Sequence, residues 1–188
     1  TEAESSAWRT TWIDAPLARL REAMGERSVS ALSDEMQHYW GSVAVCTGPG
    51  HGDLSPGNLM IERDRYTGDF ALSGLVDWGG FRADAPQGLD ACTLAITLRA
   101  TSSGRQLGQV VLELLSKPRW TAAERQWLAS SGSAPWMVEP GALRSMVLLA
   151  WLQHVDGNLI KSTRYSGTGM WGLVNIRLVL EGLTHVPR

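Results

Sequence analysis

The sequence predicts an α+β fold that is mostly helical, with one small β-hairpin near its middle. Apolar residues recur at helical spacing along most of the chain, and between residues 58 and 77 the pattern changes to that of two short strands. The length of 188 residues and the 44% content of hydrophobic residues are typical of one packed globular unit. We therefore expect a single domain over residues 1–188.

Helical periodicity and end signals place the individual helices. Pro16 suits the first turn of an early helix, Ser33 or Asp34 could cap the next one, and Thr121 with Glu124 forms the pattern of a capping box. The expected helices cover, in chain order, residues 12–24, 30–39, 89–100, 106–116, 121–128, 141–160 and 171–183.

The hairpin is expected from two short runs of strand-forming residues on either side of a turn. The first run is Asn58–Glu62, the turn contains Thr67–Asp69, and the returning run is Leu72–Asp77. An antiparallel pair of this kind would bring the beginning of the first strand next to the end of the second. Residues 19 positions apart, Asn58 and Asp77, would then share one site.

Composition excludes several broad classes of function. The formal net charge is −2, which argues against a wide basic face for nucleic acid. The longest strictly apolar run is Met146–Leu152, seven residues, against the roughly 20 that span a bilayer. The polar amino end does not read as a secretory signal, and two cysteines without a Cys-x-x-Cys pair indicate a reducing compartment. We expect a cytoplasmic protein with no nucleic-acid or membrane partner.

The segment from His51 to Asn58, with the sequence HGDLSPGN, carries the chemistry. It places a carboxylate, Asp53, and an amide, Asn58, five positions apart in a loop constrained by glycine and proline, and Asp77 follows at the end of an apolar strand. Carboxylate and amide oxygens suit Mg²⁺, and phosphoryl transfer needs a metal together with a separate carboxylate that accepts the proton of the attacking hydroxyl.

These residues resemble the catalytic and metal-binding motifs of the aminoglycoside phosphotransferase and choline-kinase-like enzymes, which are small-molecule relatives of the protein kinases. The resemblance lies in residues 51–58 and in the sequence VDWG at 76–79. It implies that Asp53 is the catalytic base, that Asn58 and Asp77 bind Mg²⁺, and that His51 organises the loop. The fold it implies is a protein-kinase-like carboxy-terminal lobe.

Two further residues complete the predicted site. Ser55 is assigned to contact with the ATP phosphate or the acceptor, and a hydrogen bond to the loop backbone is the more ordinary use of its hydroxyl. Residues 84–93 resemble the next element of the family, in which an acidic residue caps a helix and tethers the catalytic loop. By that match Asp90 supports the loop, whereas Ala85 interrupts the Asp-Pro pair of the family pattern, so no role passes to Asp84.

The resemblance implies an ATP-dependent phosphotransferase that phosphorylates a hydroxyl of a small molecule, with Mg²⁺ and ATP as cofactor and co-substrate. It covers only the carboxy-terminal lobe, because the residues before His51 read as helical and contain no lysine for the phosphates. The amino-terminal nucleotide lobe is expected from the same longer protein or from another chain. The acceptor would rest on the carboxy-terminal helices, near residues such as Trp136, Glu139, Trp151 and Asp156.

Two other classes of function stay open at this point. A pseudokinase-like lobe could bind a partner or a small ligand without catalysis, and the unseen nucleotide lobe favours that reading. Alternatively, the acidic side chains and His51 are ligand types of a metal-dependent hydrolase, in which metal-bound water is the nucleophile. That set is His51, Asp53, Asp77 and Asp84.

Overall fold

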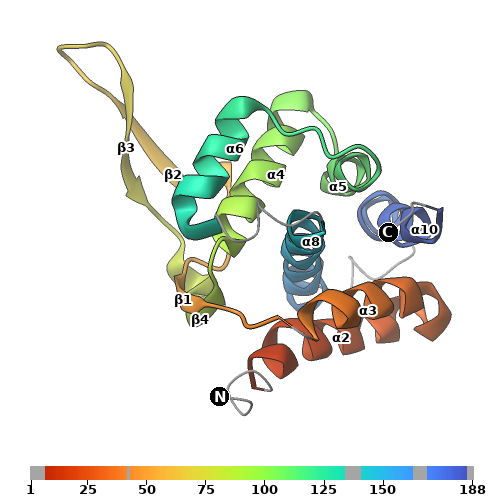
Figure 1. The fold of residues 1–188 in the computed structure, drawn as a ribbon. Coiled ribbons are helices and arrows are strands. Elements are labelled where there is room, and N and C mark those ends of the chain that lie inside the picture. Colours follow the sequence, from red (N-terminus) through yellow and green to blue (C-terminus); the bar gives the residue numbers. More distant parts are fainter. Residues whose placement is uncertain (1–6, 42, 134–140, 163–168, 186–188) are drawn as a thin grey trace.

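The structure, a computed structural model, describes residues 7–41, 43–133, 141–162 and 169–185. These residues form an α+β fold in which helices predominate and two small antiparallel sheets make up the β component (Figure 1). The predicted α+β class is therefore confirmed. The predicted acceptor residues Trp136 and Glu139 lie outside the described residues.

Helices account for most of the described chain. The α-helices are α2 (Ala15–Met24), α3 (Glu26–Trp40), α4 (Leu89–Ser103), α5 (Leu107–Ser116), α6 (Ala122–Leu128), α8 (Ala142–Lys161), α9 (Met170–Gly172) and α10 (Leu178–His185). Single turns of π-helix and 3₁₀-helix complete the set, namely η1 (Thr10–Asp14), η2 (Pro56–Asn58), η3 (Trp78–Gly80), η4 (Ala129–Ser133) and η6 (Leu173–Arg177). Helix α3 begins at Glu26, so the predicted start near residue 30 and the cap at Ser33 or Asp34 were wrong.

The two sheets lie next to each other at the edge of the helical body. Strand β2 (Leu59–Arg63) pairs with β3 (Phe70–Leu75), which confirms the predicted hairpin, and this hairpin projects away from the helices as an arm (Figure 1). Strand β1 (Thr47–Gly50) pairs with β4 (Arg82–Pro86) at the base of that arm. The β1–β4 pair was not predicted, because a Gly-Pro-Gly sequence is typical of a turn and its partner strand is more than thirty residues away.

Helix α8 is the centre of the core. It packs against α2, α3, α4 and α5 (Figure 1), and most of its side chains between Ala142 and Asp156 are buried. Trp151 is fully buried, and its indole N–H donates a hydrogen bond to the carbonyl of Asn175 at 2.7 Å. This buried polar contact fixes the position of α8, which supplies one wall of the site described below.

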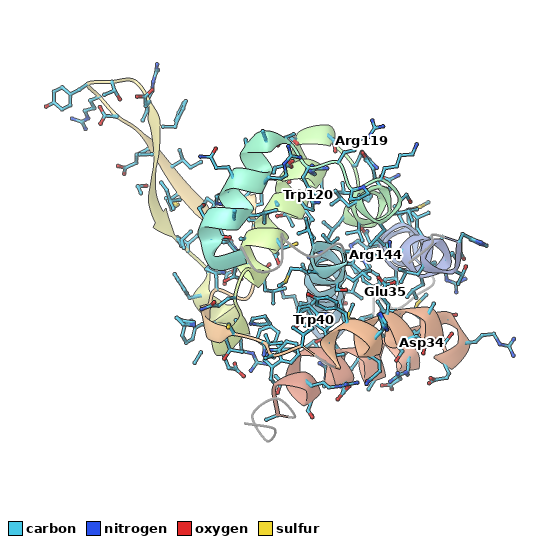
Figure 2. All side chains as sticks on the ribbon, in the orientation of Figure 1. Asp34, Glu35, Trp40, Arg119, Trp120 and Arg144 are labelled. Carbon is cyan, nitrogen blue, oxygen red and sulfur yellow. The ribbon has the colours of Figure 1, made fainter. Side chains whose placement is uncertain are left out.

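Charged pairs connect helices that are distant in the sequence. Arg144 on α8 makes two hydrogen bonds to Glu35 on α3, of 2.5 and 3.1 Å, and a third to the carbonyl of Leu115 at 2.9 Å (Figure 2). Arg99 pairs with Glu124 in the same bidentate manner, which holds the pKa of Glu124 at about 2. Such pairs fix the relative positions of helices as well as contributing charge-assisted hydrogen bonds.

The predicted capping box at the start of α6 is confirmed. The side chain of Thr121 accepts a hydrogen bond from the backbone N–H of Glu124, and the Glu124 carboxylate accepts one from the N–H of Thr121. This capping box could be predicted because its sequence pattern lies within four consecutive residues. Among the described residues no helix is long and apolar enough to cross a membrane.

Candidate functional site

A pocket of about 470 Å³ is lined by three of the candidate residues of the sequence analysis. Its walls come from the loop after β1, the turn after β3, the start of α4 and the carboxy-terminal half of α8. Asp53, Asp77 and Asp90 line it, so three acidic side chains from three separate segments face one space. The sequence predicted that Asp53 and Asp77 would lie close together, because the hairpin between them brings its two ends together.

Asp90 holds the loop that carries Asp53. Its carboxylate accepts hydrogen bonds from the backbone N–H groups of His51 and Gly52, at 2.5 and 3.1 Å. Asp90 lies in the first turn of α4, where the helix dipole favours a negative charge. The cap predicted by the resemblance is not formed, because Gly88 occupies the N-cap position and no side chain caps α4. The carboxylate is directed to the loop instead.

His51 connects the loop that carries Asp53 to the end of the hairpin. Its ring Nε2 lies 2.9 Å from the carbonyl oxygen of Val76, which can only accept, so Nε2 carries the hydrogen. Nδ1 then accepts the backbone N–H of Asp53 at 3.4 Å. The side chain is 3% exposed and packs against the ring of Trp78 with 4.7 Å between centroids. Both ring nitrogens are engaged, so His51 has no lone pair left for a metal.

The loop and the turn after β3 also touch through their backbones. A Cβ built on Gly52 would lie 1.9 Å from the carbonyl oxygen of Gly80, and Gly52 has a φ of +80°. Only glycine fits both conditions, because an L side chain is disfavoured at this φ and has no room. This contact holds Asp53 and Asp77 in fixed relation.

We expect Gly52→Ala to destabilise the protein by at least about 1–3 kcal/mol, since it strains the backbone and forces the two loops apart. Gly57→Ala in the same loop is the control, because its Cβ would meet no atom within 4 Å. Urea unfolding followed by circular dichroism measures both free energies of unfolding. Equal stabilities for the two variants would contradict the contact between Gly52 and Gly80.

The ends of the hairpin converge on Asn58 and Asp77. Leu59 pairs with Leu75, and the N–H of Val76 donates to the carbonyl of Asn58 at 3.0 Å, so Asp77 follows directly after this contact. The side-chain amide of Asn58 donates to the carbonyl of Asp53 at 2.8 Å. This bond uses the amide nitrogen, so Oδ1 is the atom of Asn58 that could bind a metal ion.

Asp77 has an unusual backbone conformation. With φ and ψ both at 60° it lies in the left-handed region, and among the described residues it is the only non-glycine residue with a positive φ. Aspartate tolerates this region better than most residues, but the conformation still carries strain. Such strain is characteristic of residues whose side chain must face a particular direction, and Asp77 lines the pocket.

Asp53 faces a cation that the sequence analysis did not include. Its carboxylate lies 3.8 Å from the ammonium of Lys161, the last residue of α8, and the two side chains are 44% and 69% exposed. An ion pair this exposed is weak. Lys161 follows Asp53 by more than one hundred residues, and the sequence between them gives no signal of the contact.

The predicted metal ligand Asn58 and the predicted loop organiser His51 do not line this pocket, and the same holds for the remaining described candidates. Ser55 does not line it, and its carbonyl accepts a hydrogen bond from the N–H of Asn58 at 3.0 Å, as part of the turn before β2. Asp156, expected near the acceptor, is paired with Arg19 by hydrogen bonds of 2.5 and 2.7 Å and does not line the pocket either. Trp151 is part of the core.

Comparisons of this chain with known proteins give no family. A scan against protein-family models, a search of curated proteins and a search of solved structures each returned no match. Within the part of the chain that the structure describes, no group of three or more His, Cys, Asp or Glu side chains is placed to hold a metal ion. The functional assignment therefore depends on the pocket and the loops around it.

Proposed function

We propose that this chain is the catalytic lobe of an ATP-dependent phosphotransferase that acts on a hydroxyl of a small molecule. The observation that carries this proposal is the linked set Asp53, Asn58 and Asp77. The amide of Asn58 bonds the carbonyl of Asp53, and the carbonyl of Asn58 bonds the N–H that precedes Asp77. A base and two oxygen ligands are thereby joined by hydrogen bonds through one amide residue.

The donor set fits a magnesium ion. Oδ1 of Asn58 and the carboxylate of Asp77 are hard oxygen ligands, and Mg²⁺ is commonly bound by one or two protein ligands together with waters and phosphate oxygens. Bound there, Mg²⁺ would neutralise negative charge on the ATP phosphates. His51 takes no part in metal binding, because its ring orients the Asp53 backbone and anchors Val76.

Asp53 would orient the acceptor hydroxyl and take its proton. The hydroxyl oxygen forms a bond to the γ-phosphorus, the bond between that phosphorus and the β–γ bridging oxygen breaks, and ADP leaves with the electron pair. The carboxylate lines the pocket. The backbone N–H of Asp53 donates to Nδ1 of His51 and its carbonyl accepts from the amide of Asn58, so the backbone on either side of the carboxylate is fixed. This arrangement positions a base without also using it as a metal ligand.

The arm formed by β2 and β3 is the surface on which we place the nucleotide lobe. Ile61, Phe70 and Leu72 are exposed on this arm, Phe70 to 75% of its surface, and they line an open apolar hollow. A two-stranded ribbon with exposed apolar side chains is marginally stable by itself. A nucleotide lobe from the same longer polypeptide or from another chain would cover these residues.

The metal assignment is tested by thermal unfolding with Mg²⁺ and ATP. At a ligand concentration ten times the Kd, binding stabilises by about 1.4 kcal/mol, which raises the Tm by roughly 3–6 °C in a protein of this size. We expect this rise to require both Mg²⁺ and ATP and to disappear in Asp77→Ala. Asp84→Ala is the control, because Asp84 is exposed on β4 outside the pocket.

Other outcomes assign the site differently. An equal rise in both variants would contradict metal binding by Asp77. A rise with Zn²⁺ or Mn²⁺ alone, lost in Asp77→Ala and unaffected by ATP, would favour the metal-dependent hydrolase. Protection by Mg²⁺ and ATP without any phosphoryl transfer in the natural polypeptide would favour the pseudokinase-like binding module.

A further inference from the structure

Helix α8 presents a polar face to the pocket, whereas most of its other side chains between Ala142 and Asp156 are buried in the core. The residues of this face are spaced by one, four, five and eight positions, which places them on one side of the helix. They are Gln153, His154, Gly157, Asn158 and Lys161. We call this set the α8 wall. The polar α8 wall thus faces the space that Asp53 also lines.

Gly157 opens the middle of the α8 wall. A Cβ built on this residue would meet no atom within 4 Å, so the space beside it is free. Glycine inside a helix is less favourable than alanine, and here no neighbouring atom requires it. The free space continues into the pocket that holds Asp53 and Asp77. This opening has room for a ligand group that lies against the helix backbone.

The hydrogen-bonding groups of the α8 wall are uncharged apart from Lys161. The amide nitrogen of Gln153 bonds the carbonyl of Trp12 at 2.7 Å and that of Asn158 bonds the carbonyl of His154 at 2.8 Å, so each residue keeps its Oδ1 or Oε1 as an acceptor. The Asn158 amide also lies 3.2 Å from Nε2 of His154, which assigns the ring hydrogen to Nδ1. Burial lowers the pKa of His154, so the ring is neutral at pH 7.

The carboxylates near the α8 wall are already engaged or have another role in the proposed function. Asp90 accepts two backbone N–H groups, Asp156 is paired with Arg19, and Asp53 and Asp77 are the proposed base and metal ligand, so a cationic acceptor would have to compete for them. An anionic acceptor would meet the carboxylates of Asp53, Asp77 and Asp90, which Lys161 alone opposes among the described residues that line the pocket. An uncharged ligand rich in hydroxyl groups needs no carboxylate partner and is not repelled by the carboxylates of the pocket.

We propose that the α8 wall is the acceptor site and that it takes an uncharged polyhydroxy compound, a monosaccharide or a cyclitol. The inference rests on the proposed phosphotransferase function and adds the substrate class to it. Oε1 of Gln153 and Oδ1 of Asn158 accept hydrogen bonds from ligand hydroxyls, and Nδ1–H of His154 donates one. The ring of the ligand lies beside Gly157, with one hydroxyl directed to Asp53.

The proposal is tested by filling the space beside Gly157 with a larger side chain. Saturation-transfer difference NMR is recorded on the chain with D-glucose, D-fructose, D-ribose and myo-inositol as neutral probes, kanamycin as a cationic probe and D-gluconate as an anionic one. We expect a signal from at least one neutral probe that falls at least fivefold in Gly157→Leu. Ile160→Ala is the control, because Ile160 is on the exposed side of α8, and it should keep the signal.

The folding of the variant is measured separately. Circular dichroism should show a Tm of Gly157→Ala equal to or above that of the natural chain, and Gly157→Ala should lower the neutral-probe signal less than Gly157→Leu does. A signal confined to kanamycin or to gluconate, a neutral signal unchanged in Gly157→Leu, or no neutral signal at all would each overturn the proposal.

Failure of the acceptor-site proposal can be told apart from failure of the proposed phosphotransferase function. The α8 wall contains no metal ligand, so the neutral-probe signal should persist in Asp77→Ala and without Mg²⁺. A sugar signal that depends on Gly157, without any effect of Mg²⁺ and ATP on the Tm, would support binding of a polyhydroxy compound at the α8 wall. It would contradict the phosphotransferase function. Protection by Mg²⁺ and ATP without a sugar signal would contradict only the acceptor class.

Discussion

We expect Asp53→Asn to lower turnover by about 10²–10⁴-fold in the natural polypeptide supplied with Mg²⁺, ATP and an accepted hydroxyl compound, the usual range for loss of a general base. The substitution keeps the size of the side chain and removes its capacity to take a proton. The backbone of residue 53 should stay in place, because its hydrogen bonds run to His51 and Asn58 through main-chain atoms. Turnover is measured by release of ADP.

The control for this variant is Asp84→Asn, which removes an exposed carboxylate of β4 outside the pocket and should leave turnover within a factor of about two. The Tm of Asp53→Asn should match that of the natural protein within a few degrees. Full turnover by Asp53→Asn would contradict the assignment of Asp53 as the catalytic base.

Glu35→Ala is expected to have the largest effect on stability. Glu35 is 8% exposed and forms two hydrogen bonds with Arg144, which connects α3 to the central helix α8 (Figure 2). Without Glu35 the guanidinium of Arg144, whose side chain is 16% exposed, keeps the carbonyl of Leu115 as its described partner. Breaking one side of a buried pair costs about 3–5 kcal/mol, which corresponds to roughly 6–20 °C in Tm at this chain length.

Asp34→Ala is the matched control, because Asp34 precedes Glu35 on the same helix and is exposed to solvent (Figure 2). We expect its free energy of unfolding to change by no more than about 0.5 kcal/mol. Thermal and urea unfolding measure both variants. Equal effects at the two positions would show that the pair between Glu35 and Arg144 adds nothing beyond a surface contact.

Local signals in the sequence were sufficient for much of the fold. The hairpin of β2 and β3 could be predicted because its two strands and its turn lie within twenty residues. The capping box of Thr121 and Glu124 is contained in four residues. The start of α3 could not be predicted from side-chain caps, because Gly25 provides the N-cap position with a positive φ and no side-chain hydrogen bond.

Contacts between segments that are distant in the sequence could not be predicted. In the sequence Glu35 is one polar residue among several on a helix, and its burial depends on where α8 places Arg144. Strand β4 has no strand-like pattern of its own and exists through pairing with β1. The approach of Lys161 to Asp53 depends in the same way on the length and direction of α8.

The amino-acid order by itself determined the functional groups and the local turns: which residues offer two carboxylates and an amide, and which short strands fold back between them. Those interactions span few residues, so neighbouring side chains and the backbone decide them. Only the tertiary structure decided what surrounds that chemistry, because the α8 wall, the tether from Asp90 and the close approach of Gly52 to Gly80 come from segments that meet through packing of the core.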